Sequence, residues 1–275
     1  MKKIIVPVDF SKDSINALEH AIKIANAVDG DIRIVHVTKS KNFELPFFIE
    51  NFDQMVGKSL EDFMELIYNK YKSKIKNKFD YKIRIGKVYR EIVNQAKYDD
   101  AYMIVMGTHG VSGFEEMWIG SNAYRVVSNA TCPVLTVRHG CLKSKYDNIV
   151  LPIDITPESR KKVPFTAELA KLLKAKIHVL LVSESDNKVI QKKLENYGNQ
   201  VEEYMVNNGL RSLVTKATGA NITDVTIDYA RKIGADMISI MTEQSSSPYN
   251  LWMGAYAQQM VNHSPLPVLS IRSHE

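Results

Sequence analysis

Val105-Met106-Gly107-Thr108-His109-Gly110-Val111-Ser112-Gly113 and the nearby Trp118-Ile119-Gly120-Ser121-Asn122-Ala123 form the stretch from which the fold can be inferred. The apolar run 101–106 predicts a buried strand that leads into the glycines, and the segment from Gly120 predicts a helix. Glycines between a strand and a helix let the backbone bend and approach a ligand. Unpaired N–H groups at a helix N-terminus attract anions. The stretch therefore predicts a place where a phosphate can bind.

Strands and helices alternate on either side of this stretch. The expected strands are 3–9, 32–37, 81–85, 101–106 and 133–137, and the expected helices follow Ser11, lie within 52–71, follow Gly86 and span 120–130. Ser11 is expected to cap the first helix and Gly30 to end it. This alternation predicts an α/β fold with a parallel sheet covered by helices on both faces. Ligands of such sheets bind at the carboxyl ends of the strands.

The second half of the chain repeats the first. The segment IIVPVD at 4–9 returns as IVLPID at 149–154, an offset of 145, and CPVLTVR at 132–138 returns as LPVLSIR at 266–272, an offset of 134. The difference, 145 − 134 = 11, locates extra residues in the first half, including part of 43–52. We therefore expect two tandem domains, at 1–140 and 146–275, joined by a polar connector.

The glycine spacing is G-x2-G-x9-G-S, from Gly107 through Gly110 and Gly120 to Ser121. Together with VPVDFS at 6–11 and CPVL at 132–135, this pattern resembles the universal stress protein family, specifically its ATP-binding branch. The resemblance covers both halves of the chain. It implies two Rossmann-like domains of the adenine nucleotide alpha hydrolase type, each a five-stranded parallel sheet flanked by helices.

The resemblance also implies that the first domain binds ATP, with Mg or Mn as a candidate metal. Gly107 and Gly110 would bend the loop around the phosphates, and Gly120 with Ser121 would present N–H groups and a hydroxyl. The family often has arginine where Val111 stands. No residue of this chain is assigned as a metal ligand or as a catalytic group. The predicted binding residues are Pro7, Asp9, Val37, Gly107, Gly110, Gly120, Ser121 and Asn122.

The adenosine would lie at the ends of the first two strands. In the family, the carboxylate matching Asp9 lies near the adenosine and the backbone matching Val37 contacts the adenine. Pro7 is expected to shape the strand beside them. Asn122 replaces the small apolar residue that commonly follows the serine.

The second half departs from the pattern. Met241, Gln244, Gly254 and Ala255 stand at the positions of the four motif residues, and Tyr249 and Trp252 add bulk. Side chains with a Cβ resist positive φ, so we predict that this domain does not bind ATP in the same way. Its expected role is structural, as one half of an intramolecular pseudo-dimer; pairing of whole chains as a homodimer stays open.

The motif residues also have a purely structural explanation. Single glycines make turns and pack helices against sheets, and Asp9 can cap the first helix. The predicted function is a stress-response regulator or sensor that binds ATP in its first domain, with slow or no hydrolysis because no P-loop lysine or water-activating residue is evident. The alternative is a tandem scaffold that binds no nucleotide and presents 43–52 to a protein partner, although the phenylalanines there also suit the domain's own core.

Composition excludes several other classes. Of 275 residues, 45% are hydrophobic and 24% charged, which is typical of a globular protein. No apolar run approaches the roughly 20 residues that cross a bilayer, so a cytoplasmic protein without a membrane partner is expected. The net charge is +5, and the lysines at 70–82 read as a solvated helix end, not as a nucleic-acid site. Cys132 and Cys141 are too few for a disulfide framework.

Overall fold

The computed structural model describes residues 2–38, 59–108, 119–141, 145–242 and 253–272. The chain divides into two compact units, Met1–Leu142 and Lys143–Glu275. The segment 43–52 lies outside the described residues. Each unit contains its own five-stranded parallel sheet with helices. This α/β architecture is the one predicted.

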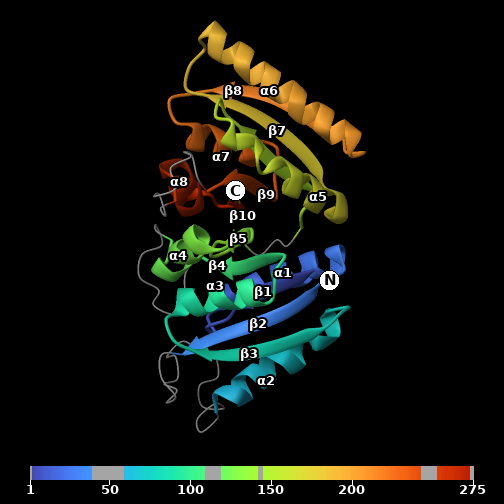
Figure 1. Ribbon diagram of the computed structural model, residues 1–275, viewed down its shortest axis with the longest axis vertical. Helices are drawn as coiled ribbons and strands as arrows, with labels where there is room; N and C mark the ends of the chain where they lie inside the picture. Colours follow the sequence, from blue (N-terminus) through green and yellow to red (C-terminus); the bar gives the residue numbers. More distant parts are fainter. Residues whose placement is uncertain (1, 39–58, 109–118, 142–144, 243–252, 273–275) are drawn as a thin grey trace. The chain divides into compact units, whose positions relative to one another are not determined.

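The first unit has strand order β3-β2-β1-β4-β5 (Figure 1). Crossovers between parallel strands are right-handed, so the reversal of direction after β3 places α1 and α2 on one face and α3 and α4 on the other. Its elements are β1 (Lys3–Pro7), α1 (Lys12–Val28), β2 (Asp31–Thr38), α2 (Leu60–Tyr71), the 3-10 turn η2 (Lys72–Lys74), β3 (Phe79–Ile85), α3 (Val88–Tyr98), β4 (Met103–Gly107), α4 (Ser121–Asn129) and β5 (Val134–Val137).

The central strand of this unit is β1. Ile4 pairs with Ile32 of β2 on one side and with Met103 of β4 on the other. Ile4, Ile5 and Val6 are completely buried, as expected for a strand with helices on both faces. The continuous apolar run at the start of the sequence therefore forms the middle of the core.

The two ends of α1 were predicted with different success. Ser11 caps the helix as predicted, and its hydroxyl accepts a hydrogen bond from the backbone N–H of Ser14 at 3.2 Å. At the other end the left-handed residue is Asp29, with φ 54°, and not Gly30. Gly30 is required for space, because a Cβ there would lie 2.8 Å from the carbonyl oxygen of Lys2.

The second unit has strand order β8-β7-β6-β9-β10, which matches the order of the first unit strand for strand. One difference concerns its first helix: shifted by the offset of 145, α1 would begin at residue 157, but α5 begins at Val163, after a 3-10 turn. The elements are β6 (Asn148–Ile153), η3 (Glu158–Arg160), α5 (Val163–Leu173), β7 (Lys176–Ser183), α6 (Lys188–Asn207), β8 (Ser212–Thr218), α7 (Ile222–Lys232), β9 (Met237–Met241), α8 (Ala255–His263) and β10 (Val268–Ile271).

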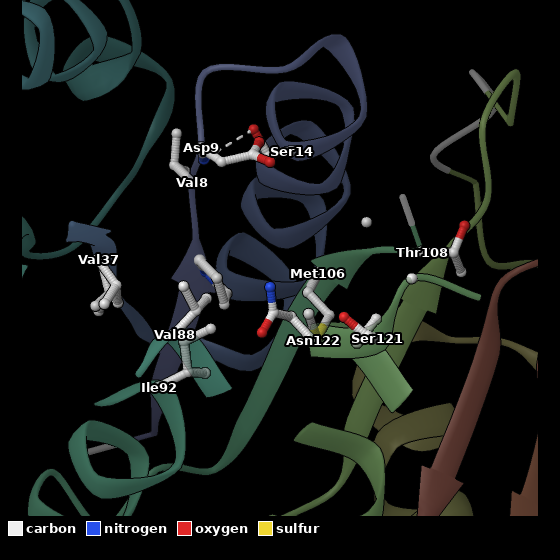
Figure 2. Close-up of a pocket in the computed structure, with 15 residues that line it drawn as sticks. Val8, Asp9, Ser14, Val37, Val88, Ile92, Met106, Thr108, Ser121 and Asn122 are labelled. Atoms are coloured by element: carbon white, nitrogen blue, oxygen red, sulfur yellow. Dashed lines mark hydrogen bonds between the residues drawn. The ribbon is translucent and has the colours of Figure 1, made fainter. Parts of the chain in front are cut away.

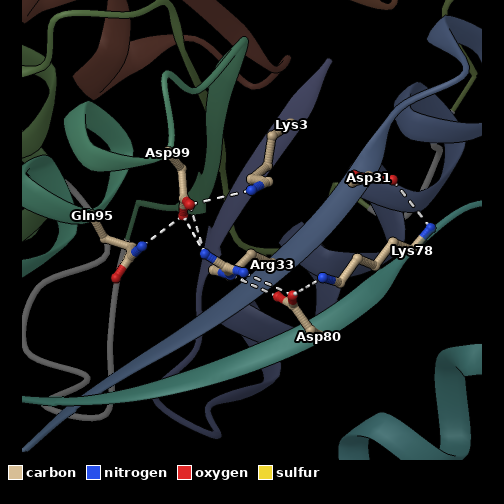
Figure 3. Close-up of polar contacts among 7 residues, drawn as sticks. All are labelled: Lys3, Asp31, Arg33, Lys78, Asp80, Gln95 and Asp99. Atoms are coloured by element: carbon tan, nitrogen blue, oxygen red, sulfur yellow. Dashed lines mark hydrogen bonds and ion pairs between the residues drawn. The ribbon is translucent and has the colours of Figure 1, made fainter. Parts of the chain in front are cut away.

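A charged network joins β1, β2 and β3 to the end of α3 (Figure 3). The guanidinium of Arg33 makes two hydrogen bonds to Asp80, at 2.6 and 2.8 Å, and two to Asp99, at 2.6 and 2.8 Å. Burial opposes the charge on both carboxylates. The hydrogen bonds from Arg33, joined at Asp99 by those from Gln95 and Lys3, outweigh burial and lower the pKa of both aspartates. The network therefore stabilises the unit above the acid range.

Replacement of Arg33 by glutamine is expected to lower the free energy of unfolding by about 3–5 kcal/mol, because Asp99, with a side chain 4% exposed, would keep a buried charge without its main partner. Urea unfolding followed by circular dichroism measures this. The matched control is Arg84→Gln, whose half-exposed and longer pair with Glu91, at 3.7 Å, should contribute less than about 1 kcal/mol. Equal losses in the two variants would contradict the assigned importance of the network.

Candidate functional site

A cavity of about 300 Å³ opens at the carboxyl ends of the strands of the first unit (Figure 2). Val37 and Thr108 lie at opposite ends of the set of side chains around it. The lining residues are Pro7, Val8, Asp9, Ser14, Val35, Val37, Val88, Ile92, Met106, Gly107, Thr108, Gly120, Ser121, Asn122 and Ala123. This size is at the lower end of the range for small-molecule pockets.

Seven of the eight binding residues predicted from the sequence line this one cavity: Pro7, Asp9, Val37, Gly107, Gly120, Ser121 and Asn122. The eighth, Gly110, lies outside the described residues, as do His109 and Val111. The cavity also includes residues that the spacing did not point to. Ser14 comes from α1, Val88 and Ile92 come from one face of α3, and Thr108 follows Gly107 directly.

One end of the cavity is formed by the start of α4. Gly120 is the cap residue and has no side chain with which to bond the first turn. Its own N–H is already used, since it donates to the carbonyl oxygen of Thr108 at 2.7 Å. The prediction that Gly120 presents its N–H to a ligand is therefore wrong. The N–H groups of Ser121, Asn122 and Ala123 form the first turn of this helix, where an anion is favoured.

The role predicted for Gly107 also needs correction. Gly107 is the last residue of β4 and is paired with Val137, so it does not bend the loop. A Cβ at this position would lie 3.1 Å from backbone atoms of Asp13. Contact of this kind is tighter than ordinary packing, so glycine suits this position, where the start of α1 approaches the end of β4 closely.

Asp9 follows the first strand and faces the cavity from the side of α1. Its Oδ1 accepts hydrogen bonds from the backbone N–H and the hydroxyl of Ser11, at 3.1 and 2.5 Å. Its own N–H donates to the hydroxyl of Ser14 at 3.3 Å. These bonds fix the carboxylate beside the helix start, which is the structural role left open in the sequence analysis. A carboxylate can accept several hydrogen bonds at once, so Asp9 can also accept one from a ligand.

Behind Asp9 the chain takes an unusual conformation. Phe10 has φ 66°, which is strained for a bulky residue. Its ring packs against His36 at 4.7 Å and Phe63 at 5.5 Å between centroids. His36 is buried, which lowers its pKa, and its Nδ1 donates to the carbonyl oxygen of Val8 at 2.7 Å. This aromatic cluster holds the turn after β1, and with it Asp9, in place.

The comparisons with known proteins agree with this architecture. The model of the universal stress protein family matches the chain twice, over residues 1–138 and 145–272. The chain belongs to the universal stress protein family. It is 36% identical to universal stress protein MJ0531 of Methanocaldococcus jannaschii over 142 residues, covering 50% of this chain and 82% of that one. It is 32% identical to universal stress protein YxiE of Bacillus subtilis over 146 residues, covering 50% and 98%.

A solved structure extends the likeness of fold to the whole of this universal stress protein. The crystal structure of a universal stress protein from Archaeoglobus fulgidus covers 98% of each chain with a TM-score of 0.77 at 20% identity. Within the described part of the chain, no helix has the length and apolar character needed to cross a membrane. The described residues likewise contain no group of three or more His, Cys, Asp or Glu side chains placed to hold a metal ion.

The helix that borders the cavity also holds the residues after β5. Asp13 accepts a hydrogen bond from Nδ1 of His139 at 2.6 Å. The carbonyl oxygen of Cys141 accepts from Nδ2 of Asn16 at 2.9 Å and from Nε2 of the buried His20 at 3.0 Å. The start of the connector is thus bound to one side of α1 at three points.

The second unit of this universal stress protein has a cavity at the corresponding place, but it holds only about 20 Å³. Asp154 and Val182 occupy the places of Asp9 and Val37, as the repeat predicts. The hydroxyl and N–H of Thr156 both donate to Asp154. The lining residues are Pro152, Asp154, Thr156, Ser159, Lys162, Val182, Met241 and Tyr256. Gln244, Tyr249 and Trp252, which the sequence analysis singled out, lie outside the described residues.

The buried side chain of Lys162 makes the stability of the second unit depend on pH. Burial lowers the pKa of this lysine from 10.5 to about 7, although the nearby Asp154 acts in the opposite direction. The unfolded chain therefore binds more protons than the folded chain between about pH 7 and 10. The free energy of unfolding rises with pH across this window, and below pH 7 the full cost of the buried charge is present.

Replacement of Lys162 by methionine should abolish this rise, which amounts to at most about 1.4 kcal/mol per pH unit. Urea unfolding at pH 7 and pH 9 measures the difference between the wild type and the variant. Lys161→Met is the matched control. The side chain of Lys161 is exposed, so this variant should keep the pH dependence of the wild type. If both variants keep the wild-type slope, Lys162 does not titrate as described.

Proposed function

We propose that the first unit binds ATP in its 300 Å³ cavity and acts as a stress-linked regulator whose surface changes with nucleotide occupancy. The observation that carries the proposal is the gathering of seven motif residues around one cavity, with an uncapped helix start at one end. The resemblance of the glycine spacing to the ATP-binding branch of the family supports the same ligand. The domains proposed are 1–140, which binds nucleotide, and 146–275, which does not.

The two ends of the cavity suit the two parts of a nucleotide. Val35, Val37, Val88 and Ile92 give one end an apolar wall against which a purine ring can pack. The start of α4 offers backbone N–H groups to phosphates, with Ser121 adding a hydroxyl. The carboxylate of Asp9 lines the cavity and suits a ribose hydroxyl, because carboxylate oxygens accept hydrogen bonds.

The described lining contains no lysine, arginine or histidine. The charge of a triphosphate would then be balanced by the helix start and by a divalent ion, Mg or Mn, held mainly by the phosphates themselves. Asp9 is the one carboxylate among the described lining residues. With no basic side chain there to stabilise charge on the transferred phosphoryl group, hydrolysis should be slow.

Addition of Mg-ATP should raise the melting temperature, because a ligand that binds only the native state stabilises it, by about 2.7 kcal/mol at 100 times its Kd. Differential scanning calorimetry measures the shift. Gly120→Val should remove it, since a branched side chain at the cap blocks the approach to the N–H groups of α4.

Gly254→Val provides the matched control. Gly254 caps α8 of the second unit in the same way, and its N–H donates to Thr242 at 2.9 Å. This variant should retain the full shift with Mg-ATP. A shift that survives in Gly120→Val, or that is lost in Gly254→Val, would place the nucleotide elsewhere.

Nucleotide should bind with a stoichiometry of one per chain. The cavity of the second unit, about 20 Å³, leaves no room for a purine or for phosphates. Isothermal titration calorimetry with a non-hydrolysable ATP analogue and Mg measures the number of sites. Two equivalent sites per chain would show that the second unit opens and binds nucleotide as the first does.

A further inference from the structure

The small cavity of the second unit is filled by side chains that the first unit lacks. Met241 stands at the position of Gly107 and Tyr256 at that of Asn122, both at the offset of 134. Lys162 corresponds to Ala17, at the offset of 145. All three substitutions add volume, and one of them adds a positive charge.

Lys162 is brought into the cavity by the altered start of α5. The residue is 2% exposed and occupies the cap position between η3 and α5. Its Nζ donates to the carbonyl oxygen of Ser159, the counterpart of Ser14. In the first unit, α1 is already regular at this point and Ala17 is completely buried within it. The 3-10 turn places Lys162 before the regular helix, and from this position its side chain reaches the pocket.

Polar groups surround the amino group of Lys162. Asp154, at the end of β6, is the carboxylate whose charge acts on Lys162. The hydroxyl of Tyr256 is buried and makes no hydrogen bond of normal geometry within the described part of the chain. The remaining space, about 20 Å³, fits one water-sized molecule between these polar groups. A buried charge without such surroundings would be very unfavourable.

We propose that the side chain of Lys162 is the resident ligand of the second unit: a primary amine, supplied by the chain itself, that occupies the pocket and excludes an external ligand. The pocket is thus a site for a primary alkylamine, recognised by the carbonyl oxygen of Ser159 and, when the amine is protonated, by the charge of Asp154. This assignment is independent of nucleotide binding in the first unit.

Chemical rescue of a truncated lysine tests the proposal on the full chain. Lys162→Ala removes Cγ, Cδ, Cε and Nζ, a fragment that n-propylammonium reproduces. n-Propylammonium chloride should raise the melting temperature of Lys162→Ala, with a smaller rise from methylammonium and from n-hexylammonium. The wild type should show no such rise, because its own side chain fills the site.

Four controls separate the effect of the amino group from that of volume and of salt. n-Butanol, an uncharged molecule of similar size, should not rescue Lys162→Ala, and sodium chloride should have no effect. Lys162→Met fills the space without charge and should gain nothing from n-propylammonium. Lys162→Ala combined with Asp154→Asn should lose most of the rescue. Equal effects of alcohol and amine, or no rescue at all, would overturn the proposal.

A second measurement covers the case in which Lys162→Ala does not fold. Brief acylation of the native wild type with an N-hydroxysuccinimide ester, followed by peptide mass spectrometry, compares lysine accessibility. Lys162 should be modified at least tenfold more slowly than the exposed Lys161, and both should react equally after unfolding in urea. Similar modification of the two lysines in the native protein would overturn the proposal.

Discussion

The pocket of the first unit depends on the close approach between the backbone of Asp13 and Gly107. A Cβ at position 107 would lie 3.1 Å from Asp13, so a side chain there would crowd the start of α1 beside β4. At the start of α1, Ser11 and Ser14 bind Asp9. In the second unit Met241 takes the place of the glycine. There the first α-helix begins at Val163, six residues after the position that corresponds to the start of α1. The two units thus differ both at this position and in where the first helix begins.

Most of the architecture could be predicted because it follows from local patterns. Apolar runs bounded by glycine, proline and aspartate predicted the strands, and the sequence repeat predicted that the same α/β domain occurs twice. Of the eight binding residues named from the glycine spacing and the family resemblance, the seven that the structure describes line one cavity. Helix ends were less predictable. A glycine after a helix suggests a left-handed cap residue, but here Asp29 has the positive φ, and Gly30 is needed because a Cβ there would lie too close to Lys2.

The sequence could not reveal how the pockets differ in depth. The expectation that Gly107 bends the loop was wrong, because this residue ends β4 and its tight contact is with Asp13, far away in the sequence. Lys162 was missed because KKVPF resembles the exposed start of a helix, and only the 3-10 turn before it directs the side chain inward. Tyr256 was missed for a related reason: it fills the cavity of the second unit together with Ser159 of η3, which is distant in the sequence. Both cases rest on tertiary contacts that no short pattern encodes.

The three hydrogen bonds that hold the connector to α1 have a practical consequence for spectroscopy. Cys132 and Cys141 are both free thiols, but burial raises the pKa of Cys132 to about 12, so almost none of it is thiolate at neutral pH. A maleimide dye should therefore attach first to Cys141. Its backbone carbonyl is bound by Asn16 and His20, on the helix that borders the cavity. The natural sequence thus carries an attachment point for a fluorophore that reports on α1, with no cysteine to add or remove.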